Sequence, residues 1–312
     1  MRKLLIPLLA ALALPNSVNS EFFCGVNKVD CPKQLFAMQN DFDSALFLFK
    51  KGSISDALDN INYFINKNNL SKKAYLLRAF IYDWGLNDKE KAFSDLKKAL
   101  NIDPEFAEAH ALIGTYYFWD FGNNILAKES HEKAIKIAPN NPHVNFEMAA
   151  RIEELAWIFR DKNQIDNAIK NFQEAIKYFT LVTLYLNENP SFIMEEYFPL
   201  GIYQAHNILG DLNFELYFLY KDTRQRKVAK EFLEKAIVQY TKAIEVSPTN
   251  EIINQYIIDR DFDAVTLDQL HLVRGNAHSW AKNGSRKACK DWKVSKEFGN
   301  EEAKKKLREW RC

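Results

Sequence analysis

The chain has 312 residues, of which 47% are hydrophobic and 27% charged, and its formal net charge at pH 7 is +1. This length and hydrophobic content suffice for a sizeable core in one long solenoid or in two compact domains. Nucleic-acid-binding proteins usually carry a basic excess, so the balance of 42 basic and 41 acidic residues argues against that class.

Residues 1–20 have the layout of a secretory signal peptide. Two basic residues follow the initial methionine, an apolar run occupies 4–14, and small or polar residues precede Glu21. The apolar run is too short to span a bilayer comfortably, so we expect cleavage before Glu21. This predicts export, to the bacterial periplasm, the outside of the cell or the thylakoid lumen of a photosynthetic organism. The alternatives are a retained anchor and a lipid anchor on Cys24, although the residues before Cys24 lack the small side chain typical of lipoprotein processing.

Four cysteines remain after this cleavage. Cys24 and Cys31 bracket a short loop in the segment 21–37, whereas Cys289 and Cys312 bracket the last helical hairpin. In an oxidising compartment the simplest pairing is Cys24 with Cys31 and Cys289 with Cys312, although four cysteines permit three connectivities. A zinc site needs close ligand pairs such as C-x-x-C, and the sequence contains none.

Residues 38–141 contain a repeat with an offset of 35 residues. It pairs Ala74 with Ala109, Tyr82 with Tyr117, Trp84 with Trp119, Ala92 with Ala127, Ala99 with Ala134, Ile102 with Ile137 and Pro104 with Pro139. An offset of this size, shared by small, aromatic and proline positions, indicates stacked helical hairpins. Each proline falls where a second helix must end, because proline has no amide hydrogen to continue it.

Residues 142–262 depart from this repeat. A long helical pattern covers 146–159, and 203–220 with 227–245 form another oversized pair. Between these patterns, the segment beginning at 187 is typical of an insertion or of a hinge between two halves. The sequence therefore predicts regular units on either side of an irregular centre.

Residues 263–312 return to the repeat and end in an amphipathic helix over 301–311. A capping helix is expected here because the last repeat would otherwise expose its apolar face. If the helices over 285–297 and 301–311 lie antiparallel, Cys289 and Cys312 fall on neighbouring turns. A disulfide between them would then hold the cap in place.

These patterns resemble the tetratricopeptide repeat. The family's small residue in the first helix matches Ala45, Ala79, Gly114 and Gly275. The alanine that opens its second helix matches Ala57, Ala92, Ala127 and Ala288. Its closing alanine matches Ala99, Ala134, Ala175 and Ala243, and its terminal proline matches Pro104, Pro139 and Pro248. In three units the first two of these positions lie one residue further apart than in the family, which lengthens the turn between the helices.

The resemblance covers 38–141 and 264–312 more closely than the residues between them. It implies an all-α fold, an α-α superhelix of about six helical hairpins with a C-terminal capping helix. It also implies that the first helix of each unit lines a concave groove. The groove candidates are then Leu76, Phe80, Asp83, Trp84, Ala111, Thr115, Phe118 and Trp119.

A plainer interpretation of the tryptophans remains open. Trp84, Trp119 and Trp280 each end the first helix of a unit, and they could fill the lengthened turn as structural residues. The groove also lacks the Lys and Asn pattern with which carboxylate-clamp repeats hold chain termini. A receptor for chaperone tails is therefore not expected.

No pattern in the chain predicts a metal or cofactor. The six histidines show no H-E-x-x-H spacing, and no G-x-x-x-x-G-K loop is present. Asp259, Asp261 and Asp263 alternate as calcium ligands do. However, Ala264 and Leu270 stand where an EF-hand would need glycine and glutamate, so a helix-capping linker is the better interpretation.

The leading hypothesis is a non-enzymatic exported scaffold whose concave groove binds a peptide or helix of another protein. An assembly factor for a membrane-associated complex is a special case of this hypothesis, and the sequence leaves the oligomeric state open. A different alternative is an α-helical hydrolase of polysaccharide or peptidoglycan in the irregular centre. Its paired acids would come from Glu153, Glu154, Glu195 and Glu196.

Overall fold

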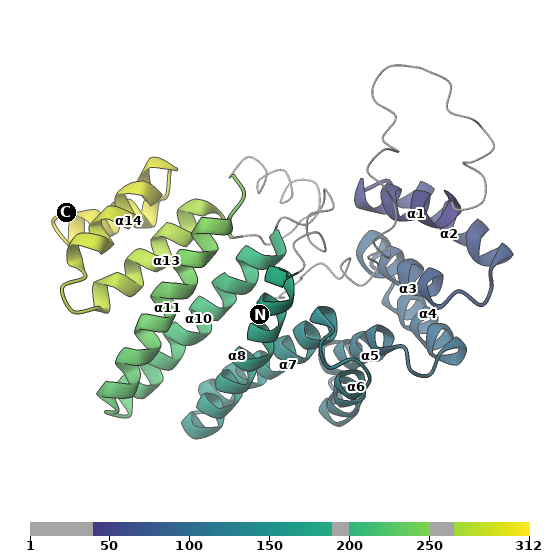
Figure 1. The fold of residues 1–312 in the computed structure, drawn as a ribbon, viewed down its shortest axis with the longest axis horizontal. Coiled ribbons are helices and arrows are strands. Elements are labelled where there is room, and N and C mark those ends of the chain that lie inside the picture. The colour runs from purple at the N-terminus through teal and green to yellow at the C-terminus, as the bar shows by residue number, and fades with distance from the viewer. Residues whose placement is uncertain (1–39, 189–199, 250–264) are drawn as a thin grey trace, which may run out of the picture. The chain divides into compact units, whose positions relative to one another are not determined.

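The computed structural model describes residues 40–188, 200–249 and 265–312, and these residues are helical with no strand. The signal-like segment, the loop of Cys24 and Cys31 and the three alternating aspartates lie outside the described residues. The chain divides into two units at 139–140, called here the N-terminal unit and the C-terminal unit. Figure 1 shows the helices of the chain coloured by residue number.

The N-terminal unit consists of three helical hairpins. The first pairs α1 (Asn40–Lys50) with α2 (Ile54–Lys67). The second pairs α3 (Lys72–Phe80), extended by the π-helical turn η3 (Ile81–Gly85), with α4 (Lys89–Ile102). The third pairs α5 (Ala107–Trp119) with α6 (Asn124–Ile137). The helix ends predicted at Pro104 and Pro139 are confirmed, since α4 ends at Ile102 and α6 ends at Ile137.

The lengthened turn between the two helices has the same geometry in the second and third hairpins. The backbone amide of Asp88 donates to the carbonyl of Tyr82 at 2.7 Å, and that of Asn123 donates to Tyr117 at 2.7 Å. Asp88 and Asn123 then cap the following helix, because each side chain accepts from the amide three residues later at 3.1 Å. The extra residue is therefore absorbed in a closed turn that also starts the second helix.

The C-terminal unit contains three further hairpins and a final helix. The first two pair α7 (Pro142–Asp161) with α8 (Ile165–Glu188), and α10 (Leu200–Asp222) with α11 (Arg226–Val246). The third pairs α13 (Leu267–Trp280) with α14 (Ser285–Glu297), and α15 (Glu301–Glu309) follows. The oversized pairs predicted for the centre are confirmed, since α7, α8, α10 and α11 have 20 to 24 residues each.

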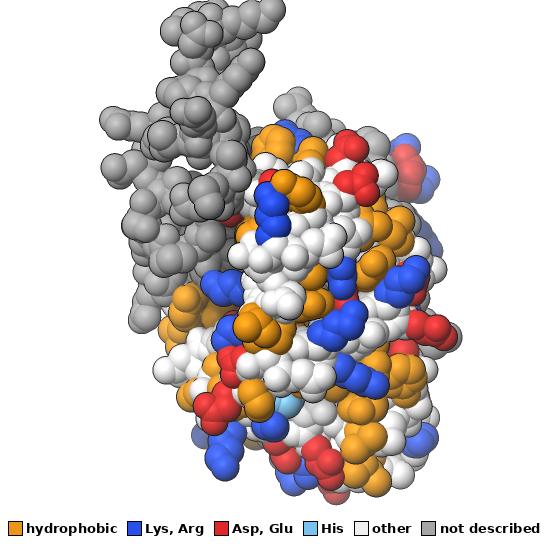
Figure 2. Space-filling view, turned by 90° about the vertical axis from the view of Figure 1, so that its right-hand side faces the viewer, with side chains coloured by type: hydrophobic (Ala, Val, Ile, Leu, Met, Phe, Trp, Pro, Cys, Tyr) orange, Lys and Arg blue, Asp and Glu red, His pale blue; other side chains and the backbone are white. Residues whose placement is uncertain are grey.

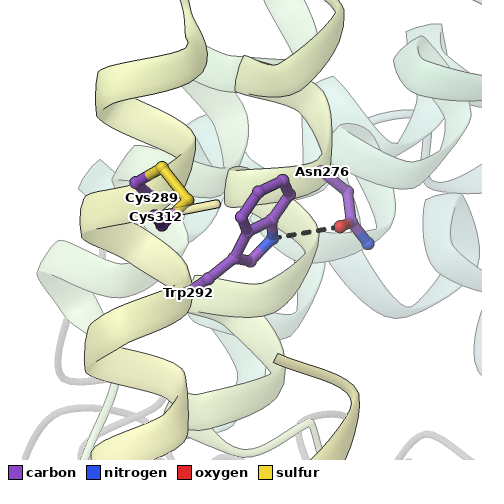
Figure 3. Close-up of a disulfide and its surroundings, with 4 residues drawn as sticks. All are labelled: Asn276, Cys289, Trp292 and Cys312. Atoms are coloured by element: carbon purple, nitrogen blue, oxygen red, sulfur yellow. Dashed lines mark hydrogen bonds between the residues drawn. A yellow bond between two sulfur atoms is a disulfide. The ribbon is translucent and has the colours of Figure 1, made fainter. Parts of the chain in front are cut away.

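The predicted disulfide between Cys289 and Cys312 is present, with the two Cα atoms 5.6 Å apart (Figure 3). It lies beside an apolar cluster in which Trp292 is fully buried. The indole nitrogen of Trp292 donates to Oδ1 of Asn276 on α13 at 3.1 Å, as Figure 3 shows. The bridge therefore ties the end of the chain to a helix that is itself anchored to its hairpin partner.

Over the described residues, the predicted all-α class with six hairpins and a capping helix is confirmed. None of the helices described is both long and apolar enough to cross a bilayer.

Candidate binding surface

The eight groove candidates lie on α3, η3 and α5 of the N-terminal unit, and the structure separates them into two groups. Leu76 and Ala111 are fully buried, and Phe80 and Phe118 are also buried. These four side chains support the helices and offer almost no surface of their own. Asp83, Trp84 and Thr115 are half-buried, and Trp119 is 39% exposed.

Each of the two tryptophans is held by an aromatic neighbour on its own helical segment. The ring of Trp84 lies 5.7 Å from that of Phe80, and the ring of Trp119 lies edge-on to Phe118 at 4.8 Å. Aromatic pairs at these separations stabilise a fixed relative orientation. The buried phenylalanines therefore position the indoles while leaving part of each indole accessible.

Thr115 is engaged inside its own hairpin. Its hydroxyl lies 3.3 Å from the carbonyl of Ala111 and 3.3 Å from Nε2 of His131 on α6. The tryptophans are therefore the groove candidates that provide accessible apolar area.

Exposed apolar side chains also follow Trp119 along the chain, in the turn between α5 and α6 and in the first turn of α6. We call the turn patch the set formed by Trp119, Phe121 (55% exposed), Ile125 (72%) and Leu126 (37%). Phe93 of α4 supports it, with its ring 5.1 Å from that of Phe121. Sequence reasoning did not identify this patch, because periodicity does not reveal which apolar side chains stay uncovered.

Figure 2 shows the face of the molecule toward α1–α4, where hydrophobic side chains occur in several places among Lys, Arg, Asp and Glu. Neither sign of charge forms a continuous patch in this view.

Two hairpins contain the same internal ion pair, which sequence reasoning missed. Arg78 on α3 binds Asp95 on α4 with two hydrogen bonds of 2.6 and 2.9 Å, and Arg274 on α13 binds Asp291 on α14 at 2.6 and 3.0 Å. In both pairs the two residues are 17 positions apart. The arginine directly precedes the small residue of the first helix, which is Ala79 in one hairpin and Gly275 in the other. That spacing is a usable sequence signal. The pairs join the two helices of a hairpin, so their role is structural.

The first half of α7 buries ionisable side chains on one helical stripe. His143, Glu147 and Arg151 are spaced four residues apart, and each is at most 7% exposed. Burial lowers the pKa of His143 to about 3, so its imidazole is neutral at pH 7. A neutral, buried histidine beside a carboxylate is a structural element here rather than a proton carrier at neutral pH.

Of the four acids proposed for a hydrolase, Glu195 and Glu196 lie outside the described residues. Glu153 is buried and accepts a hydrogen bond from the indole nitrogen of Trp157 at 3.2 Å. Glu154 is half-buried, and burial raises its pKa. Among the described residues, no three His, Cys, Asp or Glu side chains gather in a way that suits a metal ion.

Comparison with known proteins identifies the repeats. Residues 72–106, 107–141 and 153–179 match the tetratricopeptide repeat family model, so the chain contains tetratricopeptide repeats, as the residue pattern predicted. No match was found among curated proteins. Repeats of this kind form protein interaction scaffolds.

Three solved structures illustrate the likeness in fold. PilW, a type IV pilus biogenesis factor, is 16% identical, with 86% of this chain and 96% of that chain covered and a TM-score of 0.47. A tetratricopeptide repeat protein from Parabacteroides merdae is 16% identical, with 90% and 87% covered and a TM-score of 0.42. YrrB, a TPR protein with an unusual peptide-binding site, is 20% identical, with 57% and 91% covered and a TM-score of 0.33.

Proposed function

We propose that this tetratricopeptide-repeat protein is an exported, non-enzymatic scaffold that binds a peptide or helix of a partner protein through its N-terminal unit. The contact surface consists of Trp84 and Trp119 together with the rest of the turn patch. The observation that carries this proposal is the accessible indole of Trp119, packed against Phe118 and followed along the chain by three exposed apolar side chains. An exposed apolar patch on a soluble unit is commonly an interaction site.

The physical basis of such binding is the burial of a few rigid aromatic anchors. Tryptophan is enriched among the residues that dominate interface energies because it buries a large area with few rotatable bonds. Phe118 and Phe80 restrict the indoles before binding, so little conformational entropy is lost when a partner docks.

The disulfide between Cys289 and Cys312 supports export, because disulfides persist in oxidising compartments and are rare in the cytosol. The signal-like residues 1–20 point to the same compartment. We expect the mature protein to begin at Glu21. Cell fractionation with N-terminal sequencing tests this, and a cytosolic chain that retains residues 1–20 would contradict export.

Replacement of Trp119 by alanine tests the binding surface. A partner is first isolated with the wild-type protein. We expect Trp119→Ala to weaken the affinity for this partner at least about tenfold, as loss of a hot-spot aromatic residue does. Tyr63→Ala is the matched control, because Tyr63 is an aromatic residue of the same unit, 51% exposed, on the second helix of its hairpin. If Trp119→Ala keeps the wild-type affinity with an unchanged circular dichroism spectrum, the surface is assigned incorrectly.

A further inference from the structure

An aromatic cluster in the C-terminal unit surrounds the ammonium group of a lysine. Tyr217 and Phe218 lie on α10, and Trp280 ends α13. The Nζ atom of Lys221 is 3.8 Å from the centroid of the Trp280 ring and 5.8 Å from those of Tyr217 and Phe218. Three aromatic rings from two helices thus contact one cation.

The three rings pack against one another, and Trp280 is the most exposed of them. Phe218 lies edge-on to Trp280 at 5.6 Å, and Tyr217 is 5.0 Å from Phe218 and 6.1 Å from Trp280. Tyr217 is only 7% exposed and belongs to the core of the unit, whereas Trp280 is 48% exposed. The cluster therefore has a fixed base and an open side.

Lys221 contacts these rings in the absence of a closer charge partner. Among the residues that the structure describes, no carboxylate lies within 4 Å of its Nζ atom. Tryptophan offers the strongest cation–π interaction of the aromatic residues, and the ammonium lies closest to Trp280. The lysine side chain is exposed and flexible, so it can leave the rings at small cost.

Negative charge near the rings adds to this preference. The pKa of Tyr217 is raised by burial and, to a smaller extent, by the carboxylate of Asp222. Asp222 is therefore within electrostatic reach of the cluster. A cation placed over the rings gains from the carboxylate as well as from the quadrupoles of the rings.

We propose that Tyr217, Phe218 and Trp280 form a binding site for an alkylammonium group, which Lys221 occupies as an internal competitor. The lysine demonstrates that an ammonium fits the rings, and an incoming alkylammonium takes the same place when the lysine side chain swings away. The site lies in the C-terminal unit and uses neither Trp119 nor the turn patch. It therefore stands or fails independently of the binding surface proposed above.

Fluorine NMR of the full chain labelled with 5-fluorotryptophan tests this site. The chain has six tryptophans, and Trp280→Phe assigns the Trp280 signal. The probes are choline and a lysine capped as its acetyl methylamide, which separate a small quaternary ammonium from a lysine side chain. The neutral analogue 3,3-dimethyl-1-butanol has the shape of choline without its charge and serves as the control ligand.

We expect at least one ammonium probe to shift the Trp280 signal saturably at constant ionic strength. Lys221→Met removes the competitor and should tighten this binding about two- to fivefold, in line with an exposed cation–π interaction. Lys177→Met is the matched control, since the Nζ atom of Lys177 lies over Tyr178 on α8, and it should leave the binding unchanged.

Three results would overturn the proposal. The first is a Trp280 signal that neither ammonium probe shifts in the wild type or in Lys221→Met. The second is an equal shift with the neutral analogue, which would identify an apolar surface without selectivity for charge. The third is equal tightening in Lys177→Met, which would identify a general charge effect.

Discussion

Gly114 lies against the imidazole of His131, so close that a Cβ atom on Gly114 would stand 2.5 Å from the ring carbon Cδ2. Gly275 and Trp292 are 17 positions apart, as Gly114 and His131 are, and a Cβ atom on Gly275 would stand 2.6 Å from the indole nitrogen of Trp292. In the second hairpin, a buried alanine, Ala79, and a smaller partner, Leu96, occupy these positions. A smaller residue on the first helix is therefore matched by a larger side chain on the second helix where the two helices cross.

Gly114→Ala should destabilise the N-terminal unit by about 1–2 kcal/mol. Overpacking costs about 1–3 kcal/mol, and the better helix propensity of alanine offsets part of it. Urea unfolding of the purified protein measures the change. Adding His131→Leu recreates the alanine and leucine of the second hairpin, so the double variant should be more stable than Gly114→Ala alone. Strictly additive effects in this cycle would contradict the proposed volume exchange.

Asp291→Asn should destabilise the C-terminal unit by about 3 kcal/mol, because it leaves the largely buried guanidinium of Arg274 without its charge partner. Asp88→Asn is a suitable control, since Asp88 forms an exposed ion pair with Lys91 and asparagine also caps a helix. We expect a much smaller loss there, because solvent screens an exposed ion pair. Thermal unfolding of both variants tests the difference, and equal losses would count against a special role for the buried pair.

The environment of Asp291 leads us to expect a loss of stability in acid. Burial alone would raise its pKa, but hydrogen bonds from His271 and Arg274 outweigh burial and lower it. A lowered carboxylate pKa stabilises the folded state above the unfolded pKa of about 3.9, and this contribution disappears as pH falls through the folded value. The unfolding free energy of the wild type should therefore fall below about pH 4 more steeply than that of Asp291→Asn.

His143 should affect the stability of the fold at a higher pH than Asp291 does. Its pKa is lowered by burial to about 3, and Nδ1 lies 3.8 Å from Glu147, which is too far for a hydrogen bond that would favour the charged form. Unfolding allows His143 to bind a proton below about pH 6.5, so stability present above that pH is lost as the pH falls. This loss should approach about 1.4 kcal/mol per pH unit between pH 6 and pH 4.

Urea unfolding at several pH values tests the role of His143. His143→Gln should have a shallower slope than the wild type in this range, because glutamine has no proton to bind. His110, His206 and His278 also have pKa values lowered by burial, so part of the slope should remain. Identical slopes in the variant and the wild type would show that His143 is not buried in its neutral form.

Reduction of Cys289–Cys312 should lower the unfolding free energy by about 3 kcal/mol, the value expected for a loop of this length. The bridge spans 23 positions and closes over α15, so hydrogen exchange in α15 should accelerate first. A chain with Cys24→Ser and Cys31→Ser should keep this response to a dithiol. A chain with Cys289→Ser and Cys312→Ser should lose it, and an unchanged response would assign the effect to other cysteines.

Local features of the fold could be predicted from the sequence because they depend on neighbouring residues. The positions of Pro104 and Pro139 correctly placed the ends of α4 and α6. The simplest of the three possible cysteine pairings included the bridge of Cys289 with Cys312, which the structure contains. The candidate surface was less predictable. Leu76 was named for its place on a first helix, yet it is fully buried, because exposure depends on which residues the adjacent helices cover.

The sequence by itself determined the hairpins, their lengthened turns and the small residues at their crossings, since helix periodicity and chain-terminating residues are properties of short segments. Only the tertiary structure decided what surrounds each of the three equivalent tryptophans. Trp84 and Trp119 contact phenylalanines of their own segments, whereas Trp280 receives the ammonium of Lys221 from another helix. The physical reason is that packing between helices, and not residue spacing, brings α10 beside the end of α13.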